Sequence, residues 1–167
     1  MYRKLLSAVF LLAAIAGCVP QQVKPTITRI PFPLQEYKQL KSEGTSTLKG
    51  QAFLRTRGGD VKVAAGSEVL LNPVTSYSDQ WYEESYLKLN PMTPVDQQLW
   101  QYVKKKIADA SGRFTFTNVP AGSYYVTTIV TWEAATGYRG ALEPQGGAVT
   151  KKITISEGQE VEVILTK

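Results

Sequence analysis

The chain has 167 residues, a formal net charge of +5, no histidine and a single cysteine, Cys18. It can therefore form neither a histidine-dependent nucleophilic triad nor a histidine-based zinc site, and no disulfide within the chain. The positive charge is mild and dispersed, which does not indicate a nucleic-acid partner. We expect a non-enzymatic protein with no catalytic residue, no metal and no cofactor.

Residues 1–17 have the pattern of an export signal. Two basic residues, Arg3 and Lys4, precede an apolar run over residues 5–15. The run is too short for a permanent span, because crossing ~30 Å of hydrocarbon at ~1.5 Å per residue needs roughly twenty apolar residues. We therefore expect residues 1–17 to be removed.

The last four residues of this region resemble the lipobox of bacterial lipoproteins: Ile15, Ala16, Gly17 and Cys18. The resemblance implies cleavage before Cys18, a thioether-linked diacylglycerol on its sulfur and an N-acyl chain such as palmitate. Several chains on one residue suffice for stable anchoring. Val19 follows the cysteine instead of the aspartate that retains such proteins in the inner membrane, so the resemblance favours the periplasmic face of the outer membrane. The alternative is an ordinary signal peptide with an accidental cysteine.

Residues 18–44 form the expected lipidated N-terminus and tether. The segment is polar and contains Pro20, Pro25, Pro31 and Pro33, which is typical of an extended linker. Its end can form a short helix that starts near Pro33 and stops at Gly44. Such a helix would carry Leu34, Tyr37 and Leu40 on one face.

Residues 45–167 are expected to form one domain. Apolar and β-branched residues alternate in short runs that are separated by Gly, Asn or Pro, as antiparallel strands require. Seven such runs favour an all-β sandwich. The expected strands cover residues 46–56, 61–65, 67–75, 113–117, 123–132, 147–155 and 159–166.

Residues 76–108, between the third and fourth expected strands, have helical character. Ser78 can cap a helix that runs to Tyr86, and Thr93 can cap a second with Pro94 at its first position. The second helix would place Val95, Leu99, Tyr102 and Val103 on one face. Lys104, Lys105 and Lys106 would then lie at its C-terminal end, where the helix dipole favours cations. We expect this insert to lie over an edge or a face of the sandwich.

Residues 109–126 resemble the carboxypeptidase regulatory-like domain, in which an acidic-x-x-Gly-x-Phe strand leads through an apolar-Pro-x-Gly turn to a Tyr-x-apolar strand. Here the pattern is carried by Asp109, Gly112, Phe114, Pro120 and Tyr124. The resemblance implies a seven-stranded, transthyretin-like (prealbumin-type) sandwich over residues 46–75 and 109–166. It specifies a fold and says little about activity, and the helical insert departs from it.

Aromatic side chains are the remaining signal, because tyrosine and tryptophan anchor interfaces. Our main hypothesis is a cell-envelope module that binds a protein partner and takes part in assembly. The alternative is a module that binds carbohydrate or peptidoglycan through exposed aromatic platforms. A simpler interpretation is that most of these aromatics only seal the insert onto the sandwich. The candidate binding residues are Trp81, Tyr82, Tyr86, Trp100, Lys104, Lys105 and Lys106.

Overall fold

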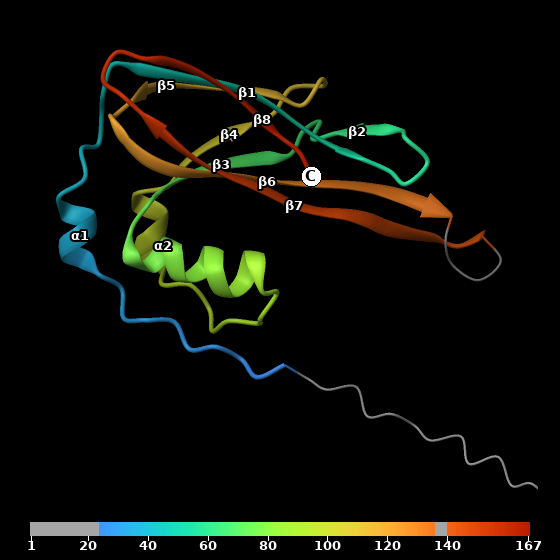
Figure 1. The fold of residues 1–167 in the computed structure, drawn as a ribbon, viewed down its shortest axis with the longest axis horizontal. Helices are drawn as coiled ribbons and strands as arrows, with labels where there is room; N and C mark the ends of the chain where they lie inside the picture. Colours follow the sequence, from blue (N-terminus) through green and yellow to red (C-terminus); the bar gives the residue numbers. More distant parts are fainter. Residues whose placement is uncertain (1–23, 136–139) are drawn as a thin grey trace, which may run out of the picture.

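The computed structural model describes residues 24–135 and 140–167 and shows two β-sheets packed face to face (Figure 1). The expected two-sheet, predominantly β architecture is therefore confirmed. The predicted strand runs are found within a few residues, except that two are longer and one strand was not expected. The strands are β1 (Ser46–Arg55), β2 (Val61–Val63), β3 (Glu68–Pro73), β4 (Lys104–Ile107), β5 (Arg113–Val119), β6 (Gly122–Ala135), β7 (Leu142–Ile155) and β8 (Glu160–Leu165).

The first sheet is built around β1. Strand β5 pairs with it antiparallel, and β8 pairs with it in parallel, from Thr47 opposite Glu160 to Ala52 opposite Leu165. Strand β2 continues along the same edge of β1 as β5, because the Ala52 N–H donates to the Gly112 carbonyl while the Ala52 carbonyl accepts from Ala64. The central strand thus has partners on both edges.

The second sheet has the order β4-β3-β6-β7 and is antiparallel throughout. Strands β6 and β7 form a long hairpin that projects beyond the rest of the body (Figure 1). Both are longer than the sequence predicted, since pairing extends to Ala135 opposite Leu142.

The main core lies between the two sheets and follows strand alternation. In β5 Phe114 and Phe116 are buried while Arg113 and Thr115 are exposed, as their period of two predicts. Before this strand Gly112 adopts φ +72°, and a Cβ there would lie 2.6 Å from the Ala52 carbonyl oxygen, so only glycine fits. After it, the buried Tyr124 hydroxyl donates to the Pro120 carbonyl across the turn.

Helical segments cover the outer face of the second sheet (Figure 1). Helix α1 (Leu34–Lys38) confirms the predicted short helix, although it ends before Gly44. Helix α2 (Ser76–Trp81) continues as the π-helical segment η1 (Tyr82–Leu87). A 3₁₀ turn, η2 (Gln97–Gln101), follows further along the chain. The predicted insert therefore lies on a face of the sandwich.

Two predictions for the insert are wrong in detail. Thr75, not Ser78, caps α2, and Ser78 is its partner in the capping box. The second expected helix is replaced by η2 and by strand β4, so residues 24–135 and 140–167 contain eight strands instead of the expected seven. Strand β4 pairs with the otherwise open edge of β3, and this pairing satisfies backbone groups that a helix would have left unpaired.

None of the helices in the described part of the chain has the length and apolar character that a membrane span needs. The predicted signal, lipobox and Cys18 lie outside the described residues.

Candidate functional site

A pocket of about 190 Å³ lies on the outer face of the second sheet. Strand alternation selects its floor: Val69 and Leu71 of β3 face the main core, so Leu70 and Asn72 face outward. Thr127 of β6 lies opposite Leu70 and completes the floor. The sheet thus supplies a rigid base for the site.

The walls of the pocket come from three segments that are distant in the sequence. Helix α2 supplies one wall, the segment around η2 a second, and the N-terminal segment a third. The wall residues are Tyr77, Ser78, Trp81, Val95, Leu99, Trp100, Val103 and Arg29. Apolar and aromatic side chains therefore dominate, with few polar groups among them.

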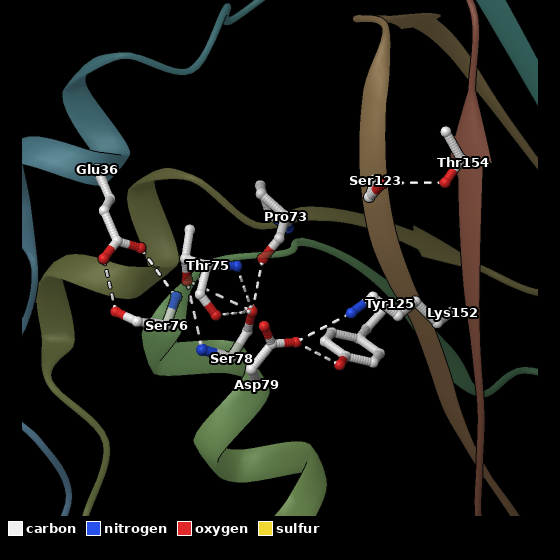
Figure 2. Close-up of polar contacts among 10 residues, drawn as sticks. All are labelled: Glu36, Pro73, Thr75, Ser76, Ser78, Asp79, Ser123, Tyr125, Lys152 and Thr154. Atoms are coloured by element: carbon white, nitrogen blue, oxygen red, sulfur yellow. Dashed lines mark hydrogen bonds and ion pairs between the residues drawn. The ribbon is translucent and has the colours of Figure 1, made fainter.

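Hydrogen bonds fix the start of α2 (Figure 2). This helix carries Tyr77 and Trp81. The Thr75 N–H donates to Ser78 Oγ at 2.8 Å, and the Ser78 N–H donates back to Thr75 Oγ1 at 3.3 Å. Ser78 Oγ also donates to the Pro73 carbonyl at the end of β3. The helix is thus bonded directly to the strand that forms the pocket floor.

Carboxylates of two elements hold α2 from outside the pocket (Figure 2). Glu36 of α1 accepts from the Ser76 N–H and from its hydroxyl. Asp79 of α2 accepts from the Tyr125 hydroxyl of β6 and forms an ion pair with Lys152 of β7. Burial, aided by the neighbouring Asp79 carboxylate, raises the pKa of Tyr125 well above the usual tyrosine range.

A second small core ties the N-terminal segment to the insert. Tyr37 is fully buried, stacks on Phe32 with ring centroids 4.6 Å apart, and accepts a hydrogen bond from Thr75 Oγ1. Burial raises the pKa of this tyrosine too. Tyr77 and Leu99 belong to the same core and also line the pocket. Part of the expected tether is therefore a structural part of the domain.

Arg29 is the one charged side chain among the described residues that line the pocket. Its backbone N–H donates to Thr93 Oγ1 and its Nε to the Thr93 carbonyl, at 2.9 and 2.8 Å. The guanidinium carbon lies 5.5 Å from the centre of the Tyr77 ring. Its terminal Nη groups form no hydrogen bond within the described part of the chain, so they are available to a ligand.

Asn72 presents an unsatisfied polar group at the floor. Its Oδ1 is buried and has no hydrogen-bond partner among the described residues. The other polar side chains here are engaged, since Ser78 bonds to Pro73 and Thr127 bonds to Thr150. An unpaired buried acceptor costs about 1–3 kcal/mol, and a ligand hydroxyl could recover this once the Asn72 side chain rotates toward the pocket.

Two tryptophans flank the pocket. Trp100 is 39% exposed, and Lys105 Nζ lies 4.6 Å from the centre of its ring. Lys105 also pairs with Glu68 at 3.5 Å, so its charge is partly balanced. Trp81 is partly buried and contacts Tyr125 edge-on, with ring centroids 6.2 Å apart.

The structure brings together only some of the predicted site residues. Trp81 and Trp100 line the same pocket. Tyr82 and Tyr86 lie beside it: Tyr82 stacks on Tyr125 at 4.6 Å, and Tyr86 accepts from the Thr150 N–H at the edge of β7. The simpler interpretation, that aromatics seal the insert onto the sheet, holds for these two tyrosines.

The three lysines are not at a helix end, contrary to prediction, because Lys104, Lys105 and Lys106 belong to β4. Strand alternation therefore separates them. Lys105 lies opposite Leu70 on the pocket side, while Lys104 and Lys106 lie opposite Leu71 and Val69. Lys104 Nζ donates to the Ser42 carbonyl. The lysines thus do not form one cationic patch.

Sequence reasoning missed Arg29 and Asn72. Arg29 lies in the segment predicted to be a tether, and its sequence neighbours do not distinguish it. Asn72 did leave a signal, because it is a polar residue at an outward position of the apolar strand run that ends at Pro73. No group of three or more Asp, Glu, His or Cys side chains that could hold a metal occurs in the described residues.

No protein-family model matches the chain, and no curated protein matches it significantly. Among solved structures, it is similar to the crystal structure of a Pseudomonas aeruginosa protein described as a "putative carbohydrate binding protein". The TM-score is 0.73 and the sequence identity 29%, over 83% of this chain and 99% of that one. The similarity thus spans essentially the whole neighbour.

Proposed function

We propose that this chain is a carbohydrate-binding module and that the pocket beside Trp81 and Trp100 is its binding site. The observation that carries the proposal is the buried, unpaired Oδ1 of Asn72 in a pocket flanked by two indole rings. A sugar ring matches this arrangement, because its C–H faces pack on aromatic rings while its hydroxyls pair with polar groups. The description of the solved neighbour supports the same function.

The size of the pocket suits one sugar unit. Its volume of about 190 Å³ is below the ~300–1,000 Å³ typical of pockets for drug-sized ligands. A longer glycan would therefore place one unit inside and its neighbours along the exposed edge of Trp100. The residues act by binding and orientation alone, and we propose no catalytic step.

The proposal is tested by tryptophan fluorescence. The chain has three tryptophans, so Trp132→Phe leaves Trp81 and Trp100 as the only tryptophans, which are excited selectively at the red edge of the absorption band. We expect neutral or acidic glycans from a panel that includes peptidoglycan fragments to shift this emission. Trp100→Ala should abolish binding measured by calorimetry, whereas Leu89→Ala, at a residue that is 72% exposed and outside the pocket, should not. Failure of every glycan in the panel to bind would reject the function.

Protein binding is a second candidate, favoured by a different surface. Leu87 and Leu89 follow Tyr86 and are 52% and 72% exposed. Exposed apolar residues beside tyrosines are typical of protein contacts. In-cell crosslinking from position 87 should then capture one specific envelope protein, and capture that is unchanged when Leu89→Asp is added would argue against it.

We further propose that the chain is anchored by lipid on Cys18 at the periplasmic face of the outer membrane. The support is the residue pattern at positions 3–18, which is that of a lipoprotein signal. Cys18→Ala should abolish incorporation of labelled fatty acid and release the protein from the membrane fraction. Membrane retention of the variant would contradict the proposal.

For the fold, we propose a transthyretin-like sandwich to which β4 and the insert have been added. The strand-turn-strand unit of β5 and β6, where the regulatory-domain pattern falls, supports this assignment. Superposition of an experimental structure on that family is the test, and a different strand order would reject it.

A further inference from the structure

The polar groups of the pocket differ in what they can accept from a ligand. Asn72 Oδ1 is a buried acceptor, so it requires a donor such as a hydroxyl. Arg29 carries only donors, and its Nη groups are unbonded in the described part of the chain. A ligand that satisfies both therefore needs a hydroxyl donor at one position and a strong acceptor at another.

The charges around the pocket favour an anionic acceptor. Arg29 is the charged lining residue, and Lys105 lies over Trp100 at the rim. Two acidic side chains on the surrounding elements already accept hydrogen bonds from the protein. Asp79 is held by Tyr125 and Lys152, while Asp96 Oδ1 caps η2 by accepting from the Gln98 N–H. None of the described lining residues is acidic.

Arg29 is also held in place before any ligand arrives. Its backbone and its Nε are bonded to Thr93, and Tyr77 lies beside the guanidinium. A guanidinium that is fixed in this way keeps its outer edge for a planar two-oxygen acceptor, which a carboxylate provides. Little side-chain entropy is then lost on binding.

We propose that the pocket selects sugars that carry a carboxylate, such as uronic-acid units, and that Arg29 is the residue that sets this selectivity. The inference rests on the carbohydrate-binding function proposed above and names its ligand class. The carboxylate pairs with Arg29, a ring hydroxyl donates to Asn72 after that side chain rotates toward the pocket, and the apolar face of the ring lies against a tryptophan.

The test compares methyl glucuronide with methyl glucoside. These two ligands differ only at C6, which is a carboxylate in the first and a hydroxymethyl group in the second. Calorimetry on the purified full-length protein should show about tenfold tighter binding of the glucuronide, as expected for a charge-assisted pair. The preference should shrink as salt rises, since the pair is only partly buried. Equal affinity for the two ligands would overturn the selectivity and leave carbohydrate binding intact, whereas binding of neither, nor of any longer glycan, would reject both.

Variants separate selectivity from a purely structural role of Arg29. Arg29→Gln should remove the preference, so that glucuronide and glucoside bind with equal affinity, and Arg29→Lys should keep part of the preference because the charge remains. Lys38→Gln is the matched control, since it removes one positive charge from an exposed position outside the pocket. If Arg29→Gln weakened both ligands equally, Arg29 would only position its segment and the inference would be wrong.

Discussion

The unpaired acceptor of Asn72 predicts that replacing this residue by an apolar one raises the stability of the unliganded protein and abolishes ligand binding. Leucine has nearly the same shape as asparagine and no polar atoms. In Asn72→Leu the buried Oδ1 disappears, and the new side chain meets Leu70, Leu99 and Val103 around the pocket. We therefore expect the unliganded variant to be more stable than the wild type and unable to bind sugar.

The magnitude follows from the state of that one atom. A buried acceptor without a partner costs about 1–3 kcal/mol, and removing it should return most of this amount. Leucine also suits a strand better than asparagine does. For a domain of this size, about 1 kcal/mol shifts the melting temperature by roughly 2–4 °C, so an increase of several degrees is expected.

Urea and thermal unfolding of the unliganded proteins measure the effect, with calorimetry for binding. Asn90→Leu is the matched control, because the Asn90 amide donates to Glu84 and loses this bond on substitution. It should be neutral or destabilised. If Asn72→Leu were destabilised to the same degree, Oδ1 would be paired in solution, for example by an ordered water, and the reasoning from an orphan acceptor would fail.

Three further predictions concern the framework of the site. Thr75→Ala should lower the free energy of unfolding by about 1–2 kcal/mol, because it removes the cap of α2 and the bond to Tyr37, while Thr75→Ser should retain most of it in the same urea titration. Above about pH 10 the unfolded chain loses a tyrosine proton that the folded chain keeps at Tyr125, so the free energy of unfolding should fall with rising pH. In thermal melts from pH 8 to 11, Tyr125→Phe should make this fall less steep. An unchanged slope in the variant would contradict the prediction. Gly112→Ala should lower the free energy of unfolding, measured with denaturant, by at least about 2 kcal/mol, because φ is positive and the new Cβ would clash with the Ala52 carbonyl. Gly59→Ala should lower it clearly less, because φ is also positive there but the space is open.

The sheets could be predicted because their signals are local. Alternation at Phe114 and Phe116 and the turn at Gly112 are each encoded within a few residues, and both are found in the structure. The end of the insert could not be predicted in the same way. Leu99 and Val103 have helical spacing, but they pack into the second core from a 3₁₀ turn and from the residue just before β4. Local pattern cannot show that β3 has an open edge that a later segment will fill.

The candidate site was predicted only for its aromatic part. Trp81 and Trp100 were identifiable because tryptophan is a rare residue type that often anchors binding interfaces. Arg29 and Asn72 acquire their meaning from neighbours far along the chain: Arg29 contacts Thr93, and Asn72 lies opposite Tyr125 in the register of β3 and β6. Such information resides in the tertiary arrangement and has no counterpart in sequence spacing.

The parallel pairing of β1 with β8 has a consequence for biosynthesis. Leu48 lies opposite Val161, so these partners are 113 positions apart in the sequence. At about 5–20 residues per second, a ribosome needs roughly 6–23 s to make that stretch, during which β1 lacks one of its neighbours. Nascent chains should therefore remain sensitive to protease and recognisable to chaperones until the final strand emerges, and long-range pairing of this kind closes slowly even then. Such a delay is compatible with the export proposed above, because a polypeptide that has not closed its fold stays competent for translocation.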